Sequence, residues 1–116
     1  MTTDTFSIAE SQHGQTCVLS ITGRIDSGNA DKLMQKLKAL AASDVRNVLL
    51  DMGAVKYLTS AAFRVLLVGN GSLKAKSGQL ALCGLTGHVR ELFEMGGLLQ
   101  SFTILESPEE GLRKLQ

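Results

Sequence analysis

Residues 49–66 read Leu-Leu-Asp-Met-Gly-Ala-Val-Lys-Tyr-Leu-Thr-Ser-Ala-Ala-Phe-Arg-Val-Leu, and this stretch decides the fold. Its apolar start, ending in Asp51, predicts a buried strand, and Thr59-Ser60 stand where a helical pattern begins. A hydroxyl at such a junction can cap the helix by accepting a hydrogen bond from its free N–H groups. A phosphate on the same hydroxyl would face those groups and the positive end of the helix dipole. The junction can therefore be a plain helix cap, for which the local sequence alone argues, or a phosphorylation switch.

Apolar residues on both sides of this stretch alternate between strand-like and helix-like spacing. Strands are expected at 6–8, 16–22, 48–51, 80–82 and 102–105. Helices are expected at 30–41, from the Ser60 cap to Gly78, at 86–95 and from 108 onward. Strands that alternate with helices predict an α/β fold with a mixed, partly parallel sheet of four to five strands and about four helices. Because no linker or repeat is visible, residues 1–116 are expected to form a single domain.

Local details of these elements can also be predicted. Residues 16–22 alternate loosely, as in a half-buried strand, and Leu67 is expected on the buried face of its helix. Gly69 and Gly71 within that helix would each weaken it, and either a close packing contact or a frayed or kinked helix would explain them. Gly78 is expected to end the same helix as its C-cap, and Thr86 to cap the next one.

The composition excludes several classes of function. The 12 basic and 11 acidic residues leave a net charge of +1, and only 4% of residues are aromatic, so no nucleic-acid partner is expected. No apolar stretch approaches the roughly 20 residues that span a bilayer. The start of the chain lacks a signal-peptide pattern, so we expect the protein in the cytoplasm without membrane insertion. Cys17 and Cys83 lie in strand-like runs, which favours buried free thiols over a disulfide.

The sequence contains little that would indicate an enzyme. The two histidines, His13 and His88, stand in no metal-binding spacing, and no phosphate-binding glycine loop is present. A triad of Ser60, His88 and Asp51 can be written down, but the serine lacks the Gly-x-Ser-x-Gly elbow. We therefore expect no metal, no cofactor, no catalytic residue and no enzymatic activity.

Three segments together resemble the STAS domain family, named for sulfate transporters and anti-sigma factor antagonists. They are the strand and loop leading to Thr59-Ser60-Ala61-Ala62-Phe63, the segment Ile21-Thr22-Gly23-Arg24-Ile25-Asp26, and Leu80-Ala81-Leu82-Cys83-Gly84-Leu85 with Val89 and Leu92. The first is similar to the family's Asp-Ser-Ser-Gly-Leu or Ser-Ser-Ala-Gly-Leu, and the second to its Gly-x-Leu-Asp. Nearly the whole chain is covered, and the resemblance implies the STAS-like fold.

The resemblance also implies a site at the loop–helix junction. Ser60 is the expected phosphate acceptor, with Thr59 as the alternative, although Thr59 stands where one family motif has Asp and Ala62 where both have Gly. The partner-binding residues implied are Asp26, Thr59, Ser60, Ala61 and Ala62. Asp26 could instead cap a helix, and Asp51 could simply accept backbone hydrogen bonds in its loop.

By this resemblance the unphosphorylated domain binds a serine kinase that is also an anti-sigma factor, and phosphorylation releases it. A PP2C-like phosphatase would restore the unphosphorylated form, and the domain itself would be a monomer or a weak dimer. The alternative function is that of a STAS accessory subunit in a transporter or sensory assembly, which would use the same surface for permanent docking.

Overall fold

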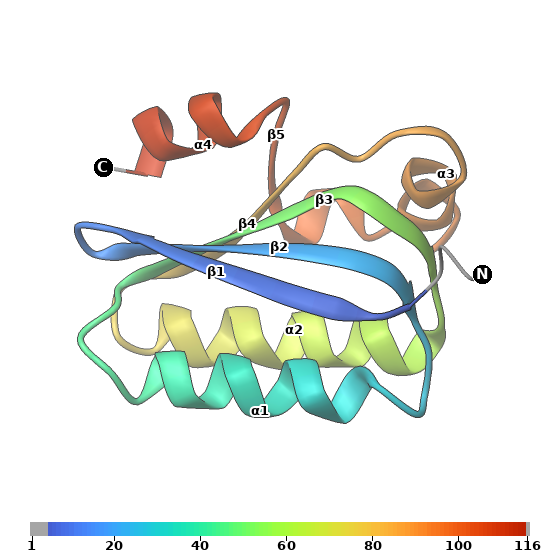
Figure 1. Ribbon diagram of the computed structural model, residues 1–116. Helices are drawn as coiled ribbons and strands as arrows, with labels where there is room; N and C mark the ends of the chain where they lie inside the picture. Colours follow the sequence, from blue (N-terminus) through green and yellow to red (C-terminus); the bar gives the residue numbers. More distant parts are fainter. Residues whose placement is uncertain (1–4, 116) are drawn as a thin grey trace.

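A five-stranded sheet forms the centre of the computed structural model, which describes residues 5–115 (Figure 1). Its strands are β1 (Ser7–His13), β2 (Thr16–Ile25), β3 (Asn47–Leu58), β4 (Gln79–Cys83) and β5 (Thr103–Leu105), in this spatial order. β1 runs antiparallel to β2, and all other neighbouring pairs are parallel. The predicted mixed α/β sheet is confirmed.

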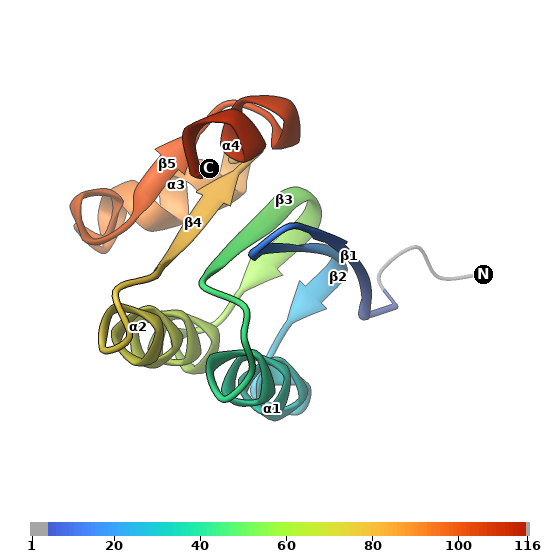
Figure 2. The same cartoon turned by 90° about the vertical axis from the view of Figure 1, so that its left-hand side faces the viewer.

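Residues 5–115 also form four α-helices and one short 3₁₀-helix. They are α1 (Ala30–Ala41), α2 (Ser60–Lys74), α3 (Gly87–Met95), η1 (Leu99–Ser101) and α4 (Pro108–Leu115). Figure 2 shows α1 and α2 side by side under one face of the sheet, whereas α4 lies over the other face. The predicted number of helices is therefore correct.

Helices on both faces explain why the start of β2 is buried more completely than predicted. Cys17 and Leu19 belong to the main core beneath α1 and α2, while Val18 packs in a second cluster beneath α4. All of Thr16–Leu19 is buried, so the expected half-buried alternation was wrong for this segment. Cys17 and Cys83 lie in different clusters and are both free and buried, which confirms the thiol interpretation.

The prediction that a strand ends at Asp51 was wrong, because β3 continues to Leu58. Its pairing with β2 shifts twice: Met52 and Gly53 together stand opposite Ile21, and one further extra residue follows Val55. These β-bulges break the alternation of apolar side chains from which a strand is predicted. β3 thus continues seven residues beyond Asp51, to Leu58, and the bulges account for two of these residues.

The end of α2 also differs from the prediction. Ser77, with φ of 69°, takes the left-handed position, and Gly78 follows it, donating its N–H to the Leu73 carbonyl at 2.8 Å. Glycine is needed at position 78 for a different reason, because a Cβ there would overlap the carbonyl oxygen of Arg46. Thr86 does precede α3, but its side chain makes no capping hydrogen bond with the described residues.

The apolar face of α2 is rotated slightly from the predicted one. Leu66 and Leu73 are buried as expected, whereas Leu67 is 42% exposed. Gly69 is buried against Leu37 of α1, so a close packing contact accounts for this glycine. None of the helices within residues 5–115 has the length and apolar character required to cross a lipid bilayer.

Candidate functional site

The candidate site lies where β2 and β3 end side by side. Ile25 and Leu58 are register partners in this parallel pair, so Asp26 and Thr59 follow neighbouring strand ends. The Thr59 N–H donates to the Ile25 carbonyl at 3.1 Å, and its hydroxyl donates to the same oxygen at 3.4 Å. The structure thus brings the Asp26 segment next to Thr59-Ser60, as one partner-binding surface with these residues requires.

Ser60 is not the helix cap that the sequence predicted. Thr59 occupies the N-cap position with extended backbone angles (φ −95°, ψ 173°), and Ser60 is the first residue of α2. The Thr59 carbonyl accepts the N–H groups of Ala62 and Phe63 at 3.0 and 3.2 Å. No side chain among the described residues caps α2. Ser60 therefore stands exposed at the positive end of the helix, and its hydroxyl is not committed to a cap.

The two alanines after Ser60 have different environments. Ala61 is half-buried, whereas Ala62 is completely buried in the main core. A binding partner can therefore touch Ser60 and Ala61 but not the side chain of Ala62. The methyl group that replaces the family's glycine points into the domain, so it does not obstruct access to Ser60.

Asp26 fixes the turn that leads into α1. One of its carboxylate oxygens, Oδ1, accepts the N–H groups of Gly28 and Asn29 at 2.9 and 3.0 Å. Asn29 is the N-cap residue of α1, and its side chain accepts the Asp26 N–H and donates to the Arg24 carbonyl, both at 2.9 Å. Asp26 thus supports the start of α1 and remains exposed at the candidate site.

Asp51 lies away from this site, in the middle of β3. Its Oδ1 accepts the N–H of Gly53 at 3.0 Å, which agrees with a structural role, although within a bulged strand and not in a loop. Gly84 approaches the same carboxylate closely, since a Cβ on Gly84 would lie 3.2 Å from Oδ1. Asp51 is therefore part of the packing between β3 and the end of β4.

The sequence analysis missed a cluster of aromatic and cationic side chains beside Thr59. The guanidinium carbon of Arg24 lies 5.0 Å from the ring centroid of Tyr57. The ring of His88 stacks on Tyr57 with centroids 5.7 Å apart and an interplanar angle of 17°. The aromatic at position 57 was visible in the sequence, but its neighbours on β2 and α3 become apparent only in the folded chain.

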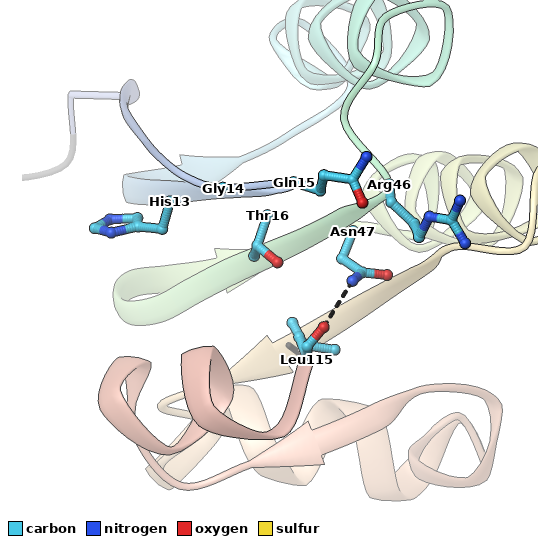
Figure 3. A pocket seen from close by; sticks show the side chains of 7 residues that line it. All are labelled: His13, Gly14, Gln15, Thr16, Arg46, Asn47 and Leu115. Atoms are coloured by element: carbon cyan, nitrogen blue, oxygen red, sulfur yellow. Dashed lines mark hydrogen bonds between the residues drawn. The ribbon is translucent and has the colours of Figure 1, made fainter.

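A depression on the described surface lies at the opposite edge of the sheet, away from Ser60. It has a volume of about 450 Å³ and is lined by His13, Gly14, Gln15, Thr16, Arg46, Asn47 and Leu115 (Figure 3). The Asn47 amide donates to the Leu115 carbonyl at 2.9 Å and accepts the Gln79 N–H at 3.2 Å, so it ties α4 to the sheet. Within residues 5–115, no three His, Cys, Asp or Glu side chains gather as a metal site requires.

The fold and the loop–helix junction agree with a match between residues 7–111 and the model of the STAS domain. The chain belongs to the STAS domain family. It is 38% identical over 92 residues to BtrV of Bordetella bronchiseptica, which bears the name anti-sigma factor antagonist; the match covers 79% of each chain.

Solved structures support the same fold. An anti-sigma factor antagonist from Mycobacterium paratuberculosis superimposes with a TM-score of 0.87 at 22% identity, covering 97% of this chain and 95% of that one. The phosphorylated form of SpoIIAA from Bacillus gives a TM-score of 0.74 at 17% identity, covering 97% of this chain and all of SpoIIAA. The expected resemblance to the anti-sigma factor antagonist type of STAS domain is confirmed.

Proposed function

We propose that this domain is a non-enzymatic protein-binding switch of the anti-sigma factor antagonist type. In its unphosphorylated form it binds, in the cytoplasm, a serine kinase that is also an anti-sigma factor. Phosphorylation of Ser60 by that kinase releases it, and a PP2C-like phosphatase restores binding. The likeness to BtrV, and the existence of SpoIIAA in a phosphorylated form, support this class of function.

The observation that carries the proposal is the position of Ser60 as the exposed first residue of α2. A kinase can reach this hydroxyl without unfolding the domain. A phosphate there would lie near the free N–H groups of the helix start, where a negative charge is favourable. Thr59 is the weaker candidate, because it is half-buried and its hydroxyl already donates to the Ile25 carbonyl.

Release follows from charge and desolvation. Phosphorylation adds about −1.5 to −2 charges at neutral pH. The neighbouring Ala61 is small, so a partner could approach the backbone of this junction closely. A phosphate buried in such a contact would lose its hydration without a compensating cation, which weakens the complex while leaving the domain folded.

The test begins with affinity capture, from the source cells, of proteins that bind the full chain. The captured kinase-like partner is then titrated by calorimetry with wild type, Ser60→Ala, Ser60→Asp and Thr59→Asp. Ser60→Ala should bind like wild type, and Ser60→Asp at least about tenfold more weakly, equivalent to about 1.4 kcal/mol. Ser72→Asp, at an exposed serine further along α2, is the matched control and should bind normally.

Two other results would change the proposal. A loss with Thr59→Asp alone would make Thr59 the acceptor. Normal binding by both acidic variants would exclude a phospho-switch and favour the docking subunit of a larger assembly. Intact mass spectrometry of the protein from its own cells should show one phosphate, and fragment spectra should place it on Ser60.

A further inference from the structure

The stack of Arg24, Tyr57 and His88 joins three elements at the edge of the domain that carries Ser60. Arg24 and Tyr57 are register partners in β2 and β3, and His88 lies in the first turn of α3. Arg24 and His88 are exposed, and Tyr57, whose ring both of them contact, is half-buried. Figure 1 shows the ends of β2 and β3, the starts of α1 and α2, and α3 gathered at the right-hand side.

Arg24 is held in place but keeps its hydrogen-bonding capacity. A guanidinium against an aromatic ring is restrained by cation–π attraction while its N–H donors remain available around its rim. Within residues 5–115, the ion pairs join Lys36 to Glu10, His88 to Glu91 and Arg90 to Glu94, and none involves Arg24. A restrained guanidinium of this kind is suited to bind a carboxylate through two parallel hydrogen bonds.

The surroundings add positive potential to this edge. α2 and α3 both begin here without an acidic residue in their first turns, so their positive dipole ends are not neutralised locally. Asp26 is the acidic group beside Thr59, and its Oδ1 is already engaged by two backbone N–H groups. Glu91 is exposed and lies 3.7 Å from His88, which offsets part of the charge of that histidine when it is protonated.

We propose that the Arg24–Tyr57–His88 stack is the docking point for an acidic segment, rich in Asp or Glu, on the protein partner. This inference rests on the proposed function and adds the chemistry of the partner's surface. It also adds a second reason for release. A phosphate on Ser60 brings about two negative charges to the same edge, where they neutralise the potential that attracts the partner's carboxylates.

A peptide probe tests the surface without the native partner. Hexaglutamate is titrated into the full chain, with ¹H–¹⁵N NMR as the readout. Shifts should centre on Arg24, Tyr57 and His88 and should disappear in Arg24→Gln or at high salt, because the Debye length shrinks to about 3 Å at 1 M. Shifts centred on the exposed basic end of α4, at Arg113 and Lys114, or an equal response to hexalysine, would overturn the proposal.

The captured partner provides the second test. Arg24→Glu should weaken binding at least about tenfold, and Arg24→Lys by a smaller factor, since lysine keeps the charge but loses the planar fork. Arg113→Glu makes the same change of charge at an exposed site on α4 and should leave affinity within about twofold. Circular dichroism melts show whether each variant is folded.

The outcomes separate this inference from the switch itself. If Ser60→Asp abolishes binding while Arg24→Glu behaves like Arg113→Glu, the switch stands and the docking role of the stack is wrong. If Arg24→Glu weakens binding and Ser60→Asp does not, the acidic docking surface stands and the phospho-switch is wrong.

Discussion

The side chain of Leu37 in α1 occupies the space that a Cβ on Gly69 in α2 would need, with its Cδ1 atom 2.7 Å from that position. The two helices therefore approach each other closely at this point, on the face of the sheet that carries the main core. Gly71, one half-turn further along α2, has nothing within 4 Å of its hypothetical Cβ. Close packing therefore requires glycine at position 69, whereas the space around position 71 would accept a larger side chain.

Alanine substitution should have different effects on folding stability at these two glycines. Gly71→Ala should stabilise the domain by up to about 1 kcal/mol, because alanine favours the helix and meets open space. Gly69→Ala gains the same propensity but must displace Leu37, and overpacking of this kind costs about 1–3 kcal/mol. Urea denaturation should therefore rank Gly71→Ala above Gly69→Ala by at least about 1 kcal/mol. Equal midpoints would mean that α1 and α2 separate easily.

Leu37→Ala should destabilise the domain by roughly 2–5 kcal/mol, because the leucine is only 1% exposed and fills the contact with α2. Leu67→Ala removes the same atoms from a side chain that is 42% exposed, so it serves as the matched control. Its cost should stay below about 1 kcal/mol. Chemical denaturation of both variants measures the difference, and a loss of less than about 1 kcal/mol for Leu37→Ala would contradict the observed packing.

Substitutions at Ser60 should have little effect on folding. Because Ser60 is not the cap, Ser60→Ala should change the free energy of unfolding by no more than about 0.5 kcal/mol, not by the 0.5–2 kcal/mol of a lost cap. Ser60→Asp should add about 0.3–1 kcal/mol through the helix dipole. Thermal melts at low and high salt should show this gain shrinking with salt. A large loss with alanine would instead restore the capping role.

The two cysteines should be inert in the folded protein. Burial raises the pKa of Cys17 from 9.0 to about 11 and that of Cys83 from 9.0 to about 12. Since the thiolate is the reactive form, a thiol reagent at pH 8 should label both only after denaturant is added. Rapid labelling of the native protein would contradict their burial.

The same shifts make folding stability depend on alkaline pH. The pKa of each thiol is higher in the folded state, so its contribution is complete below the unfolded pKa near 9. Above that pH the unfolded chain loses protons that the folded chain keeps, and stability falls as the pH rises toward 11–12. Urea melts at pH 8 and pH 10 should show this decrease, and Cys83→Ala should reduce it.

The purified domain should contain no stoichiometric metal and should bind nucleotides only weakly. No ligand cluster exists within residues 5–115, and the sequence has no phosphate-binding loop. Elemental analysis and calorimetry with ATP and GTP are the appropriate measurements. One zinc per chain, or micromolar nucleotide affinity, would overturn the description of the domain as a binding module.

The fold could be predicted where the periodicity of apolar residues is undisturbed. Leu33, Leu37 and Leu40 recur at helical spacing, and α1 was predicted with its observed limits. β3 was predicted too short because its two bulges shift the inward-facing positions: Val55 falls out of step with Leu50, and the alternation is restored only at Leu58. Such irregularities arise from pairing with a neighbouring strand, which local sequence does not reveal.

The candidate site was predictable in part. The family resemblance implied Asp26 and Thr59 as parts of one binding surface, and β2 and β3 do end side by side there. The capping assignment of Ser60 was wrong by one residue, a common uncertainty where helices begin. The contact of Arg24 and His88 with Tyr57 depends on tertiary packing among β2, β3 and α3, and no spacing in the sequence indicates it.

The bulges in β3 have a consequence for how this chain can vary. Each extra residue shifts the inward and outward positions of the sequence that follows by one, and the two together return Leu58 to the core and leave Tyr57 outside. Deleting either extra residue would remove its bulge and leave Leu58 opposite Ile25, so Leu58 would still face the core and Tyr57 would still face outward. The segment between Asp51 and Ser60 can therefore change its length at either bulge without a change in which of the following side chains face the core.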